Sequence, residues 1–378
     1  MSDLSGYFDY NATTPMSVVA REAWHEACDR FWHNPSSLYR EAGMAKQELE
    51  RCREEVADHL KIDEPERVIF TSGATEANNA IIRYLAETRE GKLLVSAIEH
   101  PCVEAPSQSW FGGDRCHEVS VSSETGVIDL GEIKAQLEKS TVAAVSVMAA
   151  NNETGTLQPW QELSELCRAY SVPFHSDAAQ WIGKLPSGEL ESCDFLTGSS
   201  HKFSGGKGVG FMVIPEGSDD FNGLIGGPQE GGHRAGTENL PAVMAMVAAL
   251  LDRSDSHLNE VATSSAASRD SFESKMITMG MMLIGACGPR LWNTSMFVLP
   301  HTRNLKWLTR LSQRGFSVST GSACSAGRGN PSRVMSAMGL DYEEMGRVMR
   351  ISAGWDTSSE EWDALAAAIE EVAADLAQ

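Results

Sequence analysis

The sequence predicts an α/β protein with a largely parallel central sheet covered by helices on both faces. Short apolar runs rich in β-branched residues alternate with longer segments of helical spacing, which is typical of parallel strands joined by helices. Polar clusters follow several of these runs, where such sheets bind their ligands. The strand-like runs are 68–70, 93–98, 143–148, 172–175, 195–197 and 209–214, followed later by 295–299.

Apolar residues at intervals of three and four predict the helices. The first four helical segments are 18–32, 45–60, 130–137 and 160–170. Near the C-terminus one apolar stripe is formed by Trp362, Leu365, Ile369, Val372 and Leu376. Such a stripe predicts an amphipathic helix that packs on the rest of the protein. The polar stretch 252–259 marks either a domain boundary or a loop between long helices.

Composition and charge exclude several classes of partner. The 378 residues exceed the usual size of a single domain, so we expect about two domains. A net charge of −21 disfavours binding to nucleic acid and to anionic membranes. The longest apolar stretches, 141–150 and 240–251, are shorter than the roughly 18–20 residues that span a bilayer. With no basic residue before Arg21, we expect no targeting leader and a cytoplasmic protein.

The eight cysteines are scattered and form no CxxC pair. In a chain of this size they are expected to be reduced, and most of them buried and inert. We therefore expect neither a disulfide framework nor a metal site.

Three polar segments at strand ends carry candidate chemistry. Small residues and a hydroxyl in 71–76 (TSGATE) favour phosphate binding at a helix N-terminus, although a tight turn with an N-cap gives the same letters. Asp177 ends a strand, where an acid either caps a helix or pairs with a cationic ring nitrogen. In 199–208 (SSHKFSGGKG), Lys202 and Lys207 compete for one role, and a glycine-rich surface hairpin is the structural alternative.

The order of these segments resembles the class V aminotransferase family of pyridoxal-phosphate enzymes. More narrowly, it resembles the cysteine desulfurases of iron–sulfur cluster assembly and nitrogen fixation. The matching segments are 9–15 (DYNATTP), 34–37 (NPSS), 70–78 (FTSGATEAN), 99–100, 151–155 (NNETG), 175–180 (HSDAAQ), 199–208, 234–239 (RAGTEN) and 318–325 (VSTGSACS).

The resemblance implies a set of residues that bind pyridoxal 5'-phosphate. Lys202 would hold the cofactor as a Schiff base, and Asp177 would pair with its pyridinium nitrogen. His100 would stack on the ring and transfer protons, whereas Asn152 and Gln180 would bond the phenolic oxygen. The phosphate would be surrounded by Ala74, Thr75, Ser199, Ser200 and His201.

The resemblance also implies a homodimer and a substrate. Thr237 would reach the phosphate of the neighbouring subunit, and Arg350 would bind the carboxylate of L-cysteine through its planar fork. Cys324, in a loop of small residues, would take the substrate sulfur as a persulfide and pass it to an acceptor protein.

The fold implied by the resemblance is pyridoxal-phosphate fold type I. A large domain, 16–252, would bind the cofactor. A smaller α+β domain, built from 1–15 and 253–378, would carry Cys324 and Arg350.

Two other functions remain open on the same scaffold. One is a related C–S lyase or selenocysteine lyase that needs no protein thiol, and the other is a non-catalytic scaffold. Departures from the family pattern bear on substrate preference and partner docking more than on chemistry. They are Tyr39 and Arg40, Gly231 and His233, and Asn304 and Lys306.

Overall fold

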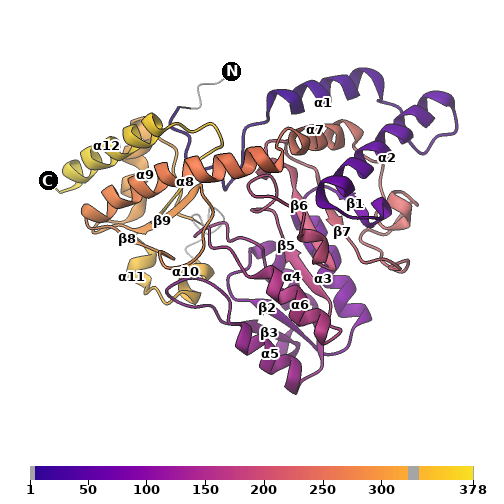
Figure 1. Cartoon of the computed structure of the whole chain (residues 1–378), viewed down its shortest axis with the longest axis horizontal. Coiled ribbons are helices and arrows are strands. Elements are labelled where there is room, and N and C mark those ends of the chain that lie inside the picture. The colour runs from indigo at the N-terminus through magenta and orange to yellow at the C-terminus, as the bar shows by residue number, and fades with distance from the viewer. Residues whose placement is uncertain (1–4, 322–331, 378) are drawn as a thin grey trace.

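The computed structural model describes residues 5–321 and 332–377, and it contains two sheets. A seven-stranded sheet lies among the helices of the first two-thirds of the chain, and a three-stranded sheet lies in the C-terminal third (Figure 1). The predicted α/β class is therefore confirmed. The division into domains at residues 15 and 252 stays a prediction.

The larger sheet has the strand order β1-β7-β6-β5-β4-β2-β3. Its strands are β1 (Val68–Thr71), β2 (Lys92–Ser96), β3 (Cys116–Val119), β4 (Val142–Ser146), β5 (Phe174–Asp177), β6 (Phe195–Ser199) and β7 (Gly210–Val213). β7 runs antiparallel to both of its neighbours, and the pairings among β6, β5, β4, β2 and β3 are parallel. The carboxyl ends of these parallel strands therefore meet at one edge of the sheet.

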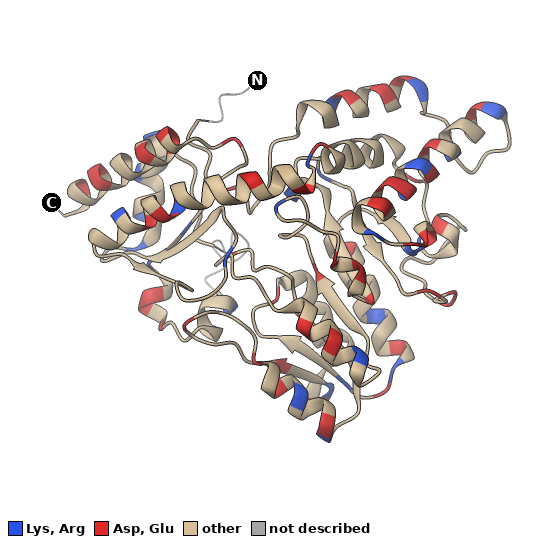
Figure 2. Ribbon diagram, viewed as in Figure 1, with Lys and Arg blue, Asp and Glu red and all other residues tan. Residues whose placement is uncertain are grey.

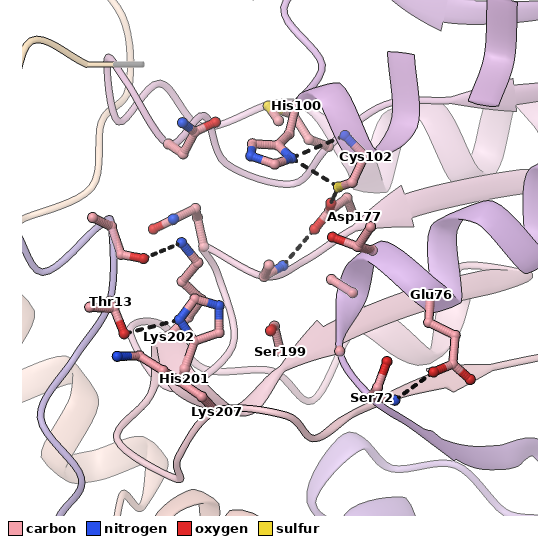
Figure 3. A pocket seen from close by; sticks show the side chains of 18 of the residues that line it. Thr13, Ser72, Glu76, His100, Cys102, Asp177, Ser199, His201, Lys202 and Lys207 are labelled. Atoms are coloured by element: carbon pink, nitrogen blue, oxygen red, sulfur yellow. Dashed lines mark hydrogen bonds between the residues drawn. The ribbon is translucent and has the colours of Figure 1, made fainter. Parts of the chain in front are cut away.

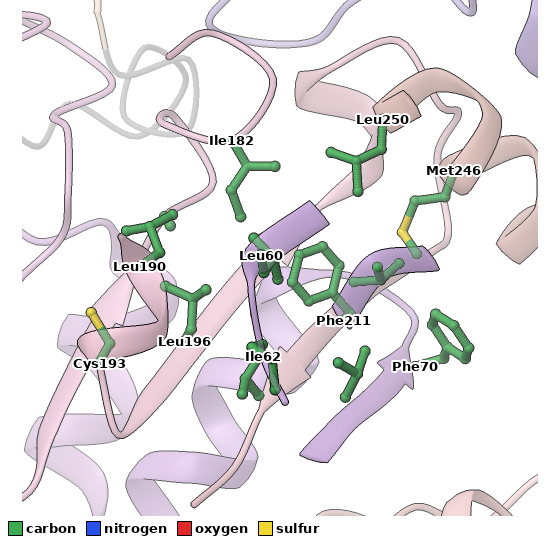
Figure 4. Close-up of a cluster of buried hydrophobic side chains, with 14 of the residues drawn as sticks. Leu60, Ile62, Phe70, Ile182, Leu190, Cys193, Leu196, Phe211, Met246 and Leu250 are labelled. Atoms are coloured by element: carbon green, nitrogen blue, oxygen red, sulfur yellow. The ribbon is translucent and has the colours of Figure 1, made fainter. Parts of the chain in front are cut away.

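Helices bury both faces of this sheet. They are α1 (Val18–Arg30), α2 (Arg40–Leu60), α3 (Ala74–Thr88), α4 (Pro101–Trp110), α5 (Leu130–Lys139), α6 (Trp160–Ala169) and α7 (Leu240–Leu251). Neighbouring strand residues point into different cores: Phe70 and Leu196 belong to one cluster, and Ile69 and Phe195 to another. Figure 4 shows the first cluster, where Leu60 at the end of α2 lies over Phe211 of β7. Burial on both faces explains why these strands read as continuous apolar runs.

The smaller sheet is antiparallel and is covered by the C-terminal helices. Its strands are β8 (Met282–Leu283), β9 (Thr294–Val298) and β10 (Val348–Ser352). The helices are α8 (Asp255–Thr278), α9 (Asn304–Gln313), α10 (Arg333–Ala337), α11 (Tyr342–Met345) and α12 (Ser359–Leu376). The predicted stripe of α12 is buried from Trp362 to Val372, and Ser358 and Glu361 form a capping box at its start.

Several predicted boundaries differ from the structure. α2 begins at Arg40, five residues before the predicted helix. The prediction missed residues 40–44 because all of them except Ala42 are exposed and form no apolar stripe. The polar stretch 252–259 is largely the start of α8, capped by Ser254, so it is not simply a loop. α8 then runs from beside α7 towards the smaller sheet (Figure 1). β3 and α4 were not predicted, since β3 is only partly buried and α4 contains Pro106.

The N-terminal segment joins the two sheets. Tyr7 and Asp9 form bridges with Ser317 and with Ser352 of β10. A few residues later, the amide of Ser17 donates to the carbonyl oxygen of Ser204, beyond β6. Residues 7–17 therefore cross from the smaller sheet to the larger one.

Charged residues lie mainly on the outer faces of the helices, with red acidic positions prominent on α2, α6 and α12 (Figure 2). Within residues 5–321 and 332–377, no helix combines the length and the apolar character needed to cross a membrane.

Candidate active site

The polar clusters at the strand ends meet in one cavity of about 520 Å³. Most of the residues expected to hold a cofactor line this cavity. They are Ala74, Thr75, His100, Asn152, Asp177, Gln180, Ser199, His201 and Lys202. Figure 3 shows that the labelled side chains come from the N-terminal segment, the start of α4, the end of β5, the turn after β6 and the start of α3.

Lys202 lies in a short 3-10 turn, Ser200–Lys202, directly after β6. Its Nζ donates to two backbone carbonyl oxygens, at 2.7 Å from that of Asn11 and 2.9 Å from that of Ala12. Burial, aided by the charge of Arg350, lowers the pKa of Lys202 to about 8. Among the described residues no carboxylate lies within ion-pair distance of this amine. Near neutral pH, the neutral and nucleophilic fraction of Lys202 is therefore much larger than that of an exposed lysine.

Lys207 lines the same cavity but is exposed to solvent. Figure 3 shows it on the far side of His201 from the group formed by His100 and Asp177. Exposure leaves its ammonium hydrated. Of the two candidate lysines, only Lys202 is placed where burial favours the free amine.

Asp177 is the last residue of β5 and is almost fully buried. Its Oδ1 accepts from the amide of Ala179 at 2.9 Å, and its Oδ2 accepts from Nδ2 of Asn78 at 2.8 Å. No helix begins here within the described chain, because residues 178–185 form turns, so Asp177 is not an N-cap. Among the residues that the structure describes, no cationic group lies within ion-pair distance of the Asp177 carboxylate. Such a carboxylate is poised to pair with a cation that enters the cavity.

Asn78, on α3, is held so that its nitrogen faces Asp177. The Oδ1 atom of Asn78 lies 2.8 Å from Oγ1 of Thr197 and 3.1 Å from Nε2 of His175. Burial lowers the pKa of His175 to about 4, so its ring is neutral, and Nε2 carries the proton that it donates. With two donors on Oδ1, the amide of Asn78 has one orientation.

His100 is the N-cap of α4. Its Nδ1 accepts from the backbone amide of Cys102 at 3.2 Å and lies 3.0 Å from the Cys102 sulfur. Burial lowers the pKa of His100, against the opposing effect of Asp177. The ring is therefore neutral, and its proton is carried by Nε2.

The start of α3 has the features of an anion-binding helix N-terminus. Its N-cap is Gly73, at φ +146°, which leaves the first amides of the helix uncovered by any side-chain cap. Glu76 in the first turn would repel an anion. Its charge is balanced by Arg234, whose Nε lies 2.7 Å from Oε1, and Oε2 accepts from the amide of Ser72 at 2.9 Å. Thr75 and Ser199 add hydroxyl groups to the lining.

His201 lies between the lysine and the N-terminal segment. Its Nδ1 is 3.1 Å from Oγ1 of Thr13, and Figure 3 shows this contact. Burial, together with the charges of Lys202 and Lys207, lowers the pKa of His201 to about 4. The ring is thus neutral and offers hydrogen bonds without adding charge.

Three of the expected residues do not line the cavity. Ser200 is fully buried beside it, and its Oγ has no partner among the described atoms. Thr237 is exposed in the segment before α7. Arg350 is buried on β10, where Nη2 lies 2.6 Å from Oδ1 of Asp9 and Nη1 donates to the carbonyl oxygen of Asn152 at 2.9 Å. Cys324 lies outside the described residues.

The structure also adds residues that the sequence did not single out. The carbonyl groups of Asn11 and Ala12 are the acceptors for Lys202, and the DYNATTP segment was the available signal for them. Cys102 lies between His100 and Asp177, 3.6 Å from Oδ2 of Asp177. Its signal was its position two residues after His100. Burial and Asp177 raise the pKa of the Cys102 thiol, so it is not a nucleophile at neutral pH.

This set of groups fits pyridoxal phosphate. Within the described ranges, the cavity holds a buried amine that has no acid partner and a buried acid that has no cationic partner. It also holds a helix N-terminus without a side-chain cap. An aldehyde, a pyridinium nitrogen and a phosphate are the complements of these three groups.

Comparison with known proteins points to one family. The aminotransferase class V family model matches residues 6–365. A cysteine desulfurase of Klebsiella pneumoniae is 35% identical over 368 residues, which cover 96% of this chain and 91% of that protein.

Solved structures agree with this similarity. A NifS-like protein superposes with a TM-score of 0.88 at 31% identity, covering 97% of this chain and 99% of its own. A structure described as SspA in complex with cysteine superposes with a TM-score of 0.78 at 29% identity, covering 92% of this chain and 98% of that one.

Proposed function

The chain belongs to the class V aminotransferase family and, within it, to the cysteine desulfurases, and from this membership we propose how its cavity works. The reaction is the pyridoxal-phosphate-dependent conversion of L-cysteine to L-alanine with release of the sulfur to an acceptor. The observation that carries the proposal is the pairing, in one cavity, of the buried Lys202 amine with the buried Asp177 carboxylate.

Each part of the cofactor has a complement in the cavity. Lys202 would hold the cofactor covalently through its Nζ, and Asp177 would keep a proton on the ring nitrogen. The neutral ring of His100 would pack on the cofactor ring, and Asn152 and Gln180 would bond its phenolic oxygen. The start of α3 would hold the phosphate with Ala74, Thr75, Ser199 and His201, and Ser200 would support this lining from its buried position beside the cavity.

Pyridoxal phosphate, when bound, supplies an electron sink that stabilises negative charge at the substrate Cα. Lys202 would move the proton at the substrate Cα, a role for which an amine with a pKa of about 8 is suited. His100 transfers protons near the ring. Arg350 orients the substrate carboxylate, and to do so its guanidinium exchanges part of its contact with Asp9 for the substrate.

Cys324 takes the sulfur. Its thiolate attacks the substrate sulfur, the substrate bond between Cβ and sulfur breaks, and Cβ gains a proton to give alanine. The sulfur remains on Cys324 as a persulfide, which an acceptor protein then takes. This assignment rests on the sequence around Cys324, because that residue lies outside the described ranges.

We further propose that the enzyme is a homodimer in which Thr237 completes the phosphate site of the partner subunit. Its exposure, and its absence from the cavity of its own chain, support this arrangement. The seven cysteines in the described ranges are all unpaired, which supports a reducing, cytoplasmic setting.

The test is an assay of purified protein with pyridoxal phosphate and L-cysteine, measuring alanine and protein-bound sulfur. Lys202→Ala should abolish alanine formation and the visible absorbance of the lysine-bound cofactor. Lys207→Ala is the matched control, and it should retain both because its ammonium is exposed. Full activity in Lys202→Ala, or loss of the absorbance only in Lys207→Ala, would reverse the assignment.

A further inference from the structure

Lys184 is a buried lysine that the proposed chemistry does not use. It lies in the turn after β5, four residues beyond Gln180, and only 1% of its surface is exposed. Within residues 5–321 and 332–377, no carboxylate lies within ion-pair distance of its amine. A lysine without an acid partner is costly to bury, so its hydrogen bonds require an explanation.

The amine of Lys184 contacts two side-chain amides. Its Nζ lies 2.7 Å from Oδ1 of Asn11 and 2.5 Å from Oε1 of Gln180. Burial lowers the pKa of Lys184 well below its usual value, and the charges of Lys202 and Arg350 act in the same direction. Even as a neutral amine, the group has two N–H bonds, so it donates to both amides in either protonation state.

These contacts determine how the Gln180 amide is oriented. Since Lys184 donates to Oε1, the amide nitrogen must point the other way, and Nε2 indeed donates to the carbonyl oxygen of Asn11 at 2.9 Å. An amide nitrogen carries two N–H bonds, so one remains for an acceptor in the cavity that Gln180 lines. The reverse orientation would place Oε1 against the carbonyl oxygen of Asn11, and neither of these oxygens carries a proton.

We propose that Lys184 is a positioning residue that holds Gln180 with its N–H donors turned towards the phenolic oxygen of the cofactor. This inference rests on the proposed function. It adds a residue that never touches the cofactor and acts on it through the orientation of a neighbouring amide. Lysine suits this role because its N–H donors match the Oε1 acceptor of Gln180 in either protonation state.

The same lysine orients a second group of the site. Oδ1 of Asn11 accepts from Lys184 and, at 3.2 Å, from Nδ2 of Asn293, so Nδ2 of Asn11 donates to Oγ1 of Thr294 at 2.8 Å. The backbone carbonyl of Asn11 is the shared acceptor of Gln180 and Lys202. Because Asn293 and Thr294 also hold the Asn11 side chain, the effect of Lys184 on the cofactor runs through Gln180.

The turn that carries Lys184 is anchored independently of these contacts. The indole nitrogen of Trp292 donates to the carbonyl oxygen of Lys184 at 2.9 Å, and that of Trp355 donates to the carbonyl oxygen of Gly183 at 2.9 Å. A variant of Trp292 thus perturbs the same turn without removing the amine, which provides a matched control.

The test compares Lys184→Met, Gln180→Leu and the double variant by titrating each apoprotein with pyridoxal phosphate. Lys184→Met should weaken binding at least about fivefold and shift the pH midpoint of the absorbance of the Lys202-bound cofactor. The double variant should bind no more weakly than Gln180→Leu alone, because Lys184 acts through Gln180. Trp292→Phe should lower Tm while leaving the affinity and the pH midpoint unchanged.

A second variant keeps the test decisive if Lys184→Met does not fold. Gln180→Glu leaves an oxygen acceptor for Lys184 but removes the N–H donors. It should therefore keep Tm within about 3 °C of wild type while losing cofactor affinity. Retained affinity in Gln180→Glu, or additive losses in the double variant, would overturn the inference.

The inference and the proposed function fail in different ways. A wild-type apoprotein that takes up no pyridoxal phosphate would refute the proposed function and this inference with it. Normal uptake by the wild type together with indifference to Lys184→Met would refute the inference alone.

Discussion

An amine reacts with an aldehyde in its neutral form, and burial puts Lys202 close to that form at physiological pH. Because the pKa of Lys202 is lowered to about 8, its neutral fraction rises as pH increases through 8. An ordinary exposed lysine would require a pH near 10.4. We expect the rate at which the apoprotein takes up pyridoxal phosphate to be half-maximal near pH 8.

Stopped-flow absorbance measures this rate across the pH range. Lys207→Ala should leave the midpoint in place, since Lys207 is exposed. A midpoint near 10 in the wild type would mean that burial does not tune the amine.

The sulfur acceptor within the chain is tested by Cys324→Ala. We expect the variant to retain the absorbance of the bound cofactor and to lose the protein persulfide, because the thiol takes no part in holding the cofactor. Mass spectrometry after incubation with L-cysteine measures the persulfide. Cys287→Ala serves as the control, since Cys287 is an exposed thiol that contributes nothing to the cavity. Undiminished alanine formation in Cys324→Ala would favour a lyase that needs no protein thiol.

Residues with a local signal were predictable from the sequence, and residues defined by distant contacts were not. Asp177 and Lys202 each follow a strand within a distinctive short segment, so their place at the sheet edge could be expected. Asn11 meets Lys202 through its backbone carbonyl, and the DYNATTP segment marked this region without showing which atom makes the contact. The contact of Arg350 with Asp9 joins positions 341 residues apart. The sequence could therefore suggest Arg350 as a substrate-binding residue but not its ion pair with Asp9.

At the scale of elements, the phosphate site depends on how α3 begins. Gly73 adopts φ +146°, a region that side chains rarely occupy, so Gly73→Ala strains the turn whatever space surrounds it. We expect the variant to lose about 1 kcal/mol or more of stability and to bind pyridoxal phosphate more weakly. Differential scanning fluorimetry and cofactor titration measure the two effects.

Gly43→Ala is the matched control for this substitution. Gly43 lies on an exposed face inside α2 with no atom near the position of an added Cβ. At this position alanine should raise the free energy of unfolding by about 0.5–1 kcal/mol and leave the affinity for pyridoxal phosphate unchanged. If Gly73→Ala behaved like Gly43→Ala, the start of α3 would not be the anion site.

The elements themselves were predicted unequally. β1 and β6 start where apolar runs predicted them, because burial on both faces leaves a continuous apolar run in the sequence. The antiparallel direction of β7 could not be predicted, since an apolar run looks the same in the sequence whichever way its strand runs in the sheet. The start of α8 reads as a loop because only a few of its positions are buried.

At the scale of the whole molecule, the proposed dimer is tested by mixing two inactive chains. Each site would use Lys202 of one subunit and Thr237 of the other. A mixed dimer of Lys202→Ala and Thr237→Val chains should therefore contain one intact site and recover cofactor affinity there. Titration of tagged, purified mixed dimers measures it. Recovery should be absent if Thr237 completes the site of its own chain. The one remaining Lys202 of the mixed dimer would then share its site with the Thr237→Val substitution.

The segment around Asn11 contacts residues that are synthesised much later. These residues are Gln180, Lys202, Thr294 and Ser352. A ribosome therefore releases this segment long before anything exists for it to bind. The lysine pocket closes only when β10 has emerged, so the pocket is among the last parts of the protein to form. A nascent chain that has already exposed Lys202 is not yet able to hold its cofactor as the finished enzyme does.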